Sequence, residues 1–376
     1  MSKEWSKNKK WNPFNSYKLL SQVYRWRNIK RGEAISPPSL ITIDPINRCN
    51  FKCSFCNAHN ILESNSNKLS DRLMKQIPDF LSNWSVGEWN VEAVCIAGGG
   101  EPTLHTSFTE LASGLKLHDI EYGVVSNGSN VLNVLDAYKD ATWVGISVDA
   151  GTAKTFKLIK KVDMFDKVIS NIEWLTGLKN CKLAEKGQGN GVSYKYLLTP
   201  ENVGEVYEAA SIAKSIGCRN FHCRPVGTPW DKIGKETVFF EFSDLQSFNS
   251  QIDKAQALED DSFGCFGITH KFDSSFDIKH DFSQCWAVFM TFVIMPGTLP
   301  DTFNLGTCCD RRGDPQMLLG ENLKDVNQIA KLWGSDKHWD IHDKVKVNTC
   351  PRCTYQPHNQ IYEHVIEDDN MTYKFI

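Results

Sequence analysis

Three cysteines stand close together near the start of the chain, as Cys49, Cys53 and Cys56. Thiolates at this spacing can converge on one iron–sulfur cube, and three of them leave one iron of a [4Fe–4S] cluster open for another ligand. A zinc ribbon needs two separated C-x-x-C pairs, and the ferredoxin runs bring a fourth cysteine. The run therefore predicts an open iron–sulfur site, with chance or zinc-binding cysteines as the alternative.

Two segments around this run are typical of strands that deliver loops to one place. Residues 40–44 are β-branched and follow Pro37 and Pro38, which predicts a buried strand leading into the cysteine loop. Residues 91–96 form a second such strand and lead into three glycines and Glu101. Glycines after a strand let the backbone approach a ligand closely, because no Cβ intervenes. The Glu101 carboxylate would supply an acceptor for an ammonium group.

The same pattern continues along the chain. Further strands are predicted at residues 122–128, 143–149, 192–197 and 220–224, and helices at 69–84, 107–117, 131–138 and 200–216. Repetition of strand and helix implies a parallel sheet with right-handed crossovers. Alternation along 143–149 places Ser147 and Asp149 on one face, where buried polar groups need partners. For Ser126 and Asn127, ordinary turn chemistry is an equal alternative to a functional role.

These motifs together resemble those of radical S-adenosylmethionine (SAM) enzymes. The resemblance implies an α/β fold, the partial (β/α)6 barrel of that family, with chemistry at the carboxyl ends of the strands. It also implies that the open iron chelates SAM, that an electron from the cluster cleaves a C–S bond, and that a 5′-deoxyadenosyl radical abstracts hydrogen. The implied cluster ligands are Cys49, Cys53 and Cys56, and the implied SAM-binding residues are Phe55, Gly99, Gly100, Glu101, Pro102, Ser126, Asn127, Ser147 and Asp149.

A second cysteine group lies near the end of the chain. Residues 292–297 and 303–308 predict a hairpin, and 326–333 a helix. This arrangement resembles the twitch domain, the shortened SPASM extension of many radical SAM enzymes, which binds an auxiliary [4Fe–4S] cluster. The implied ligands are Cys285, Cys308, Cys350 and Cys353, with Cys309 as an alternative to Cys308. A structural zinc on the same four thiolates is the competing interpretation.

Composition bounds the cellular setting. Thirteen cysteines in 376 residues are not a secreted disulfide scaffold, and the basic, aromatic start lacks the apolar core of a signal peptide. The longest apolar run, residues 285–295, is too short to span a bilayer. We therefore expect a reducing cytoplasm and no membrane partner. Five other cysteines are expected to be small core residues: Cys95, Cys181, Cys218, Cys223 and Cys265.

The first 31 residues hold nine Lys or Arg against one acid, Glu4, with aromatic residues between them. Leu19, Leu20, Val23 and Tyr24 at helical spacing predict a helix that packs across the barrel bottom with a solvated basic face. The alternative is a contact for an anionic partner, because basic and aromatic groups suit phosphates and bases.

We expect four regions: a basic extension (1–38), the barrel (39–230), a connecting segment (231–284) and the auxiliary domain (285–376). The predicted activity is radical SAM chemistry on a small molecule or peptide, with a net oxidation assisted by the auxiliary cluster. Flavodoxin or ferredoxin would supply electrons. Two alternatives remain: a nucleotide-, nucleic-acid- or peptide-modifying enzyme that docks its substrate on the basic arm, and a non-catalytic iron–sulfur or zinc protein.

Overall fold

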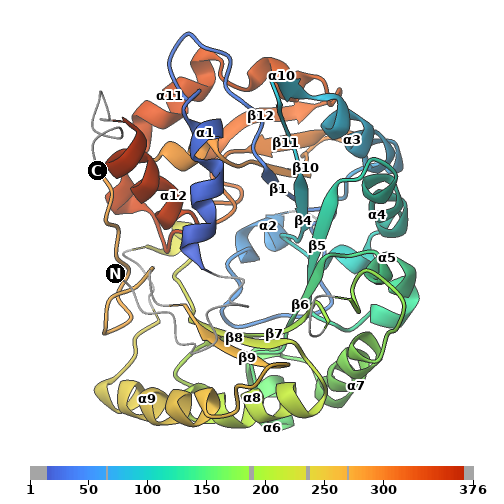
Figure 1. The fold of residues 1–376 in the computed structure, drawn as a ribbon, viewed down its shortest axis with the longest axis vertical. Helices are drawn as coiled ribbons and strands as arrows, with labels where there is room; N and C mark the ends of the chain where they lie inside the picture. The colour runs from blue at the N-terminus through green and yellow to red at the C-terminus, as the bar shows by residue number, and fades with distance from the viewer. Residues whose placement is uncertain (1–14, 65–66, 186–189, 234–237, 269–270, 368–376) are drawn as a thin grey trace.

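Strand β1 (Leu40–Ile43) lies inside a ten-stranded sheet that curves around an interior (Figure 1). This count covers the residues that the structure, a computed structural model, describes: 15–64, 67–185, 190–233, 238–268 and 271–367. In sheet order the other strands are β12 (Leu318–Leu323), β11 (Phe303–Gly306) and β10 (Val293–Pro296) before β1, then β4 (Ala93–Ile96), β5 (Glu121–Ser126), β6 (Trp143–Ser147), β7 (Val192–Leu198), β8 (Asn220–Pro225) and β9 (Gly264–Gly267).

The six predicted barrel strands are confirmed, and all neighbours from β1 to β9 pair in parallel. The sheet also extends beyond the prediction at both ends. Strand β9 comes from the segment expected to connect two domains, and it pairs with β8. On the other side β10 pairs in parallel with β1, with Thr42 opposite Val293 and Ile43 opposite Ile294.

Helices cover the outer side of the curved sheet (Figure 1). No helix within the described residues is long and apolar enough to cross a membrane. The barrel helices are α2 (His59–Ser64), α3 (Asp71–Asn83), α4 (Phe108–Leu117), α5 (Leu135–Lys139), α6 (Ala153–Lys160), α7 (Phe165–Thr176), α8 (Val206–Ser215) and α9 (Phe242–Gln256). A small hairpin, β2 (Ser85–Val86) and β3 (Trp89–Asn90), follows α3.

Local sequence explains why these elements form where they do. Helix α3 begins after Ser70, whose hydroxyl accepts a hydrogen bond from the Leu73 amide at 3.3 Å. Thr152 caps α6 in the same way, accepting from the Thr155 amide at 3.2 Å. The buried residues of these helices and strands form one hydrophobic core.

The predicted hairpin near the end of the chain is confirmed as the antiparallel pair β10 and β11. The predicted helix 326–333 appears as α10 (Gln328–Leu332), followed by α11 (Asp336–Lys344) and α12 (Gln356–Ile361). Since β10 joins the barrel sheet directly, the C-terminal region shares that sheet. The proposed boundaries at 231 and 285 stay predictions.

The N-terminal arm packs differently from the prediction. A 3₁₀ helix (Ser16–Gln22) precedes a short helix α1 (Val23–Trp26), and residues 1–14 lie outside the described part. Tyr24, assigned to the apolar stripe, is 68% exposed, whereas Arg25 and Trp26 are buried. The Arg25 guanidinium donates to two backbone carbonyls, at 2.8 and 2.7 Å, and pairs with Glu92. These partners stabilise the buried guanidinium, because burial of a charge without a partner is strongly unfavourable.

Candidate functional site

The cysteine loop follows the carboxyl end of β1, and two backbone carbonyls at the end of helix α6 accept hydrogen bonds from it. The Ser54 amide donates to the Ile159 carbonyl at 2.9 Å and the Lys52 amide to the Lys160 carbonyl at 3.2 Å. The three thiols are half-buried. Burial raises the pKa of Cys49 to about 11, with smaller contributions from the nearby charges of Glu101, Cys53 and Cys56. Burial likewise raises the pKa of Cys53 and Cys56.

The glycine turn after β4 packs directly against this loop. The Gly100 amide donates to the Ile46 carbonyl at 3.0 Å, and the Glu101 amide donates to the Arg48 carbonyl at 2.9 Å. A Cβ on Gly100 would lie 2.2 Å from the Arg48 carbonyl oxygen, so only glycine fits at this position. Two motifs that are far apart in the sequence therefore meet backbone to backbone. Gly99 lies beside Asn47, and Pro102 opens a short 3₁₀ turn.

The Glu101 carboxylate is 2% exposed and accepts hydrogen bonds from four protein donors. These are the Thr103 amide (3.2 Å) and hydroxyl (2.6 Å), the Ser126 hydroxyl (2.8 Å) and the Asn127 amide (2.7 Å). Burial raises the pKa of Glu101, while these donors oppose the shift. The side chain thus ties the ends of β4 and β5 together, and its predicted contact with the SAM ammonium stays a prediction.

Asn127 links the end of β5 to the cysteine loop. The side-chain Nδ2 of Asn127 donates to the Asn50 side-chain oxygen at 2.8 Å and lies 3.8 Å from the Cys49 sulfur. Ser126, Asn127 and Glu101 therefore form one network beside Cys49. Turn chemistry is also present, since the Asn127 side-chain oxygen accepts from the Ser129 amide at 2.9 Å. The two interpretations of Asn127 are compatible.

The expectation that Ser147 and Asp149 share one face of a strand is wrong. Strand β6 ends at Ser147, and Asp149 adopts the left-handed backbone conformation with φ of 60°. Its buried carboxylate pairs with the Lys160 ammonium and accepts from the Leu197 amide at 2.6 Å. The turn after β6 breaks the alternation that the sequence suggested. Ser147 itself is half-buried at the strand end.

Lys160 is a site residue that the sequence did not reveal. Its side chain is 2% exposed, and its ammonium lies 5.3 Å from the centroid of the Phe55 ring. Burial opposes the charged form of Lys160, but the Asp149 carboxylate, with a smaller contribution from Cys53, raises its pKa above the ordinary value. Lys160 thus carries a positive charge under the loop that holds Phe55.

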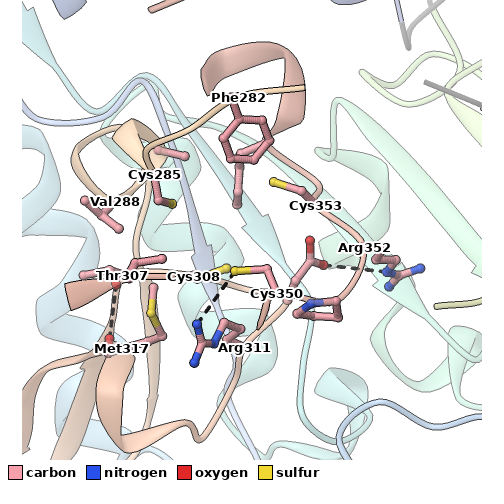
Figure 2. Close-up of a pocket in the computed structure, with 15 residues that line it drawn as sticks. Phe282, Cys285, Val288, Thr307, Cys308, Arg311, Met317, Cys350, Arg352 and Cys353 are labelled. Carbon is pink, nitrogen blue, oxygen red and sulfur yellow. Dashed lines mark hydrogen bonds and ion pairs between the residues drawn. The ribbon is translucent and has the colours of Figure 1, made fainter. Parts of the chain in front are cut away.

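The four cysteines of the C-terminal group line one pocket (Figure 2). They come from separate segments: Cys285 precedes the hairpin, Cys308 follows it, and Cys350 and Cys353 lie before α12. The Arg311 guanidinium lies 3.7 Å from the Cys350 sulfur, and the Asn359 amide 3.9 Å from the Cys353 sulfur. Hydrogen-bond donors beside thiolate sulfurs suit an iron–sulfur centre.

Cys309 does not line this pocket in the described structure. Its carbonyl accepts a hydrogen bond from Arg312 at 2.7 Å, and burial raises the pKa of its thiol. Burial raises the pKa of Cys285 to about 12 and the pKa of Cys308 above its ordinary value. Among the described residues, no three His, Cys, Asp or Glu side chains are arranged to hold a single metal ion.

The sequence also did not reveal three cationic side chains whose pKa is lowered in the folded protein. Burial and repulsion from Arg224 lower the pKa of Lys195, on β7, to about 7. Burial and repulsion from Arg352 lower the pKa of Arg224, on β8, to about 9. Burial and Arg224 lower the pKa of Lys271, which follows β9, to about 7. Lys195 and Arg224 each stand between buried residues of a strand. This alternation is the sequence signal that could have identified them.

Comparison with known proteins agrees with this geometry. Residues 43–211 match the family model described as the Radical SAM superfamily. A probable GTP 3′,8-cyclase of Saccharolobus islandicus is 29% identical over 216 residues, which are 55% of this chain and 62% of that protein. One of Metallosphaera sedula is 27% identical over 199 residues, which cover 51% and 56%. The chain therefore spans less than two thirds of these relatives.

Two solved structures share the fold over most of the chain. Streptococcus suis SuiB bound to the precursor peptide SuiA superposes with a TM-score of 0.59 at 14% identity, covering 86% of this chain and 69% of that one. The structure of anSMEcpe with bound AdoMet has a TM-score of 0.57 at 18% identity, covering 82% and 83%. At such identities the likeness shows the fold alone. Residues 43–211 are thus similar in sequence to the Radical SAM superfamily, and the chain shares its fold with these two structures.

Proposed function

We propose that this protein is a radical SAM enzyme whose reducing [4Fe–4S] cluster is held by Cys49, Cys53 and Cys56. The observation that carries the proposal is the backbone contact between the cysteine loop and the glycine turn, which places Gly100 and Glu101 against residues 46–48. When bound, the cluster and SAM supply a 5′-deoxyadenosyl radical. The fourth iron, without a protein thiolate, is the position for SAM.

The surrounding residues would orient SAM and exclude water. Gly100 lets the glycine turn pack against the Arg48 backbone, and in this proposal the turn presents its own backbone to the methionine part of SAM. Phe55, supported by Lys160, covers the loop. Glu101 fixes the positions of Ser126 and Asn127, and in this proposal its charge also attracts the SAM ammonium. Pro102, Ser147 and Asp149 complete the cradle through the turns after β4 and β6.

The second part of the proposal is an auxiliary [4Fe–4S] cluster on Cys285, Cys308, Cys350 and Cys353, in a twitch-type region. Four thiols that line one pocket support it, and Cys308 is favoured over Cys309 because only Cys308 lines that pocket in the described structure. A cluster with four thiolates has no iron left for substrate. When bound, it would supply electron transfer to or from the substrate radical, which suits a net oxidation.

The proposed substrate class is broad. Relatives are named for a GTP cyclase activity, and SuiB was solved with a precursor peptide, so nucleotides and peptides are both candidates besides other small molecules. Each SAM cleavage consumes one electron, for which flavodoxin or ferredoxin is the proposed donor in a reducing cytoplasm. The cofactors supply the radical, and the protein positions the reacting groups.

Anaerobic reconstitution tests both clusters in one design. Wild-type protein should bind about eight irons, and reductive cleavage of SAM to 5′-deoxyadenosine should be detectable by chromatography. Cys53→Ala should keep about half of the iron and lose cleavage, and Cys350→Ala should also keep about half. Cys181→Ala, at a half-buried cysteine outside both groups, is the matched control and should match wild type.

Two results would contradict the proposal. Wild-type protein with about four irons and a stoichiometric zinc ion would refute the auxiliary cluster, because zinc would then occupy the four thiolates. Cluster-loaded protein that never cleaves SAM under strong reductant would refute the enzyme activity. A non-catalytic iron–sulfur protein would then be the better description.

A further inference from the structure

Helix α6 packs directly on the cysteine loop of the first site. The Phe156 ring, on the buried side of the helix, lies edge-on to Phe51 of the loop, with ring centroids 5.9 Å apart. At the end of the helix, the carbonyls of Ile159 and Lys160 accept hydrogen bonds from loop amides at 2.9 and 3.2 Å. The helix and the loop therefore form one unit, and a molecule that contacts the outer side of α6 also lies close to the three cysteines.

The cysteine loop itself reaches the surface beside this helix. The two amides that bond to α6 belong to Lys52 and Ser54, which are both exposed. Cys53 stands between them in the chain and is half-buried. An electron that enters the first site from a protein in solution would therefore cross little of this chain beside Lys52 and Ser54.

The outer side of α6 carries a basic stripe, which consists of Lys154, Lys157, Leu158 and Lys161. The first three stand at helical positions i, i+3 and i+4, so they share one side of the helix, and Lys161 caps its end. All four residues are exposed. Leu158 is 51% exposed, which puts an apolar side chain in contact with solvent among the lysines.

This surface is positive, whereas the whole chain has a formal net charge of −3. Among the exposed side chains of residues 52–54 and 153–167, five lysines stand against two aspartates. One of these, Asp163, pairs with Lys157 at 2.7 Å, but both side chains are more than half exposed, so water and salt weaken the pair. The surface therefore keeps a positive charge that an acidic protein would complement.

The composition of the stripe also indicates the kind of partner. Redox proteins that meet transiently use small interfaces, below about 1,200 Å², and charges at the rim steer their encounter. Lysines around one exposed leucine suit such an encounter. Nucleic acid fits less well, because contacts to its bases come mainly from arginine and from aromatic rings, and neither type is exposed within residues 52–54 and 153–167.

We propose that the basic stripe of α6, together with Lys52, is the docking surface for an acidic electron carrier of the flavodoxin type that reduces the first site. This deepens the proposed function and rests on it, because that function needs one electron for each SAM cleavage. In the docked complex one electron passes from the reduced carrier to the site of the three cysteines, and no atom is transferred. The carrier is thereby oxidised and the first site is reduced.

SAM cleavage by the cluster-loaded protein tests this surface, with a purified acidic flavodoxin as the probe. The reaction is driven either by reduced flavodoxin or by dithionite, a small reductant that needs no docking surface. For Lys154→Glu/Lys157→Glu at low salt, we expect the flavodoxin concentration for half-maximal rate to rise at least about tenfold, because like charges repel. The rate with dithionite should not change. Salt at about 0.5 M should reduce the difference from wild type, because it screens exposed charges.

Calorimetric titration with oxidised flavodoxin measures docking without turnover, and the affinity should fall by a similar factor in the glutamate variant. Lys154→Arg/Lys157→Arg keeps both charges and should bind as wild type does. Lys337→Glu/Lys344→Glu is the matched control, because it makes the same change of charge at two exposed lysines of α11. This control should also bind as wild type does.

The outcomes separate this proposal from the one it rests on. Wild-type protein that fails to cleave SAM with dithionite would refute the enzyme activity. Cleavage with dithionite, but equal dependence on flavodoxin in wild type and the α6 glutamate variant, would overturn the docking surface alone. An equal effect of the α11 variant, or loss of binding in the arginine variant, would overturn it as well.

Two further results would also count against the docking surface. Loss of dithionite-driven cleavage in the α6 glutamate variant would assign the stripe to support of the cysteine loop. Binding of a single-stranded oligonucleotide by wild type, without binding of flavodoxin, would overturn the choice of partner.

Discussion

A single buried ion pair, Lys160 with Asp149, connects the two sides of the proposed SAM site. Both side chains are almost fully buried, at 2% and 1% exposed. Asp149 also holds the amide of Leu197 on β7, while the Lys160 carbonyl holds the cysteine loop. Removal of one partner would leave the other as an uncompensated charge in the interior. The pair therefore matters for position as well as for stability.

Lys160→Met should lower the free energy of unfolding by about 3–5 kcal/mol, because it leaves the Asp149 carboxylate buried and unpaired. Lys157→Met on the same helix is the control. Lys157 pairs with Asp163 in solvent, with both side chains more than half exposed, so its loss should cost less than about 1 kcal/mol. Urea unfolding followed by circular dichroism measures both. Equal losses in the two variants would contradict the structural role of the pair.

At this scale, sequence reasoning found residues that carry a motif and missed residues that act through the fold. Cys49 and Glu101 stand in short runs whose chemistry is legible without coordinates, and the structure brings those runs together. Lys160 sits in an ordinary basic helix, and its burial follows only from how α6 meets the cysteine loop. Asp149 and Lys160 are eleven residues apart in the sequence, and their ion pair forms only because the turn after β6 meets the end of α6.

Among the elements, helix α11 is joined to the C-terminal hairpin region by a buried histidine. The His338 Nε2 donates to the Val288 carbonyl at 2.9 Å, and its Nδ1 accepts from the Gly334 amide at 3.0 Å. Burial lowers the pKa of His338 to about 3, with a smaller contribution from His342. Both hydrogen bonds require the neutral ring, since a protonated Nδ1 cannot accept.

Acid should therefore weaken the packing of α11. A histidine whose pKa is lower in the folded state contributes stability above its unfolded pKa of about 6.5, and that stability is lost as the pH falls. Between pH 7 and pH 5 this one group should cost about 2 kcal/mol. Denaturation of wild type and His338→Gln at both pH values should show that difference in wild type only. His118→Gln should keep it, and a His338→Gln variant with the full difference would exclude His338 as its source.

Some elements could not be found from local pattern. Strand β9 is only four residues long and begins and ends with glycine, which has a low β-propensity, and it forms by pairing with β8. Strand β12 contains polar residues and irregular register against β11. By contrast, α6 and α7 have apolar residues at helical spacing, such as Phe156 and Ile159 in α6. This spacing is visible in the sequence and could have predicted both helices. Pairing, unlike periodicity, is a property of the assembled sheet.

For the whole molecule, the main feature is one sheet that joins the barrel strands to the C-terminal hairpin. Strand β1 is bonded on both edges, to β4 and to β10. The side chains at the junction with β10, such as Ile43 and Ile294, are fully buried. A chain that ends before β10 would expose this apolar edge and leave its backbone groups unpaired.

A truncated protein of residues 1–284 should accordingly fail to fold cooperatively. We expect it to aggregate or to unfold without a sharp transition, as measured by circular dichroism on heating, whereas the full chain should show one. This outcome follows from the β1–β10 pairing. A soluble 1–284 fragment with a sharp transition would instead support an independent auxiliary domain that begins near residue 285.

The pairing of β1 with β10 also orders events during synthesis. Strand β1 leaves the ribosome early, but its second edge has no neighbour until nearly all of the chain has been made. Contacts between such distant segments form late, because closing the long loop between them loses entropy before the contacts can stabilise the pair. The cysteine loop that follows β1 thus acquires its final support only after translation of the C-terminal region. In the proposed function, the first site would therefore take up its iron–sulfur cluster after β10 has been translated and has paired with β1.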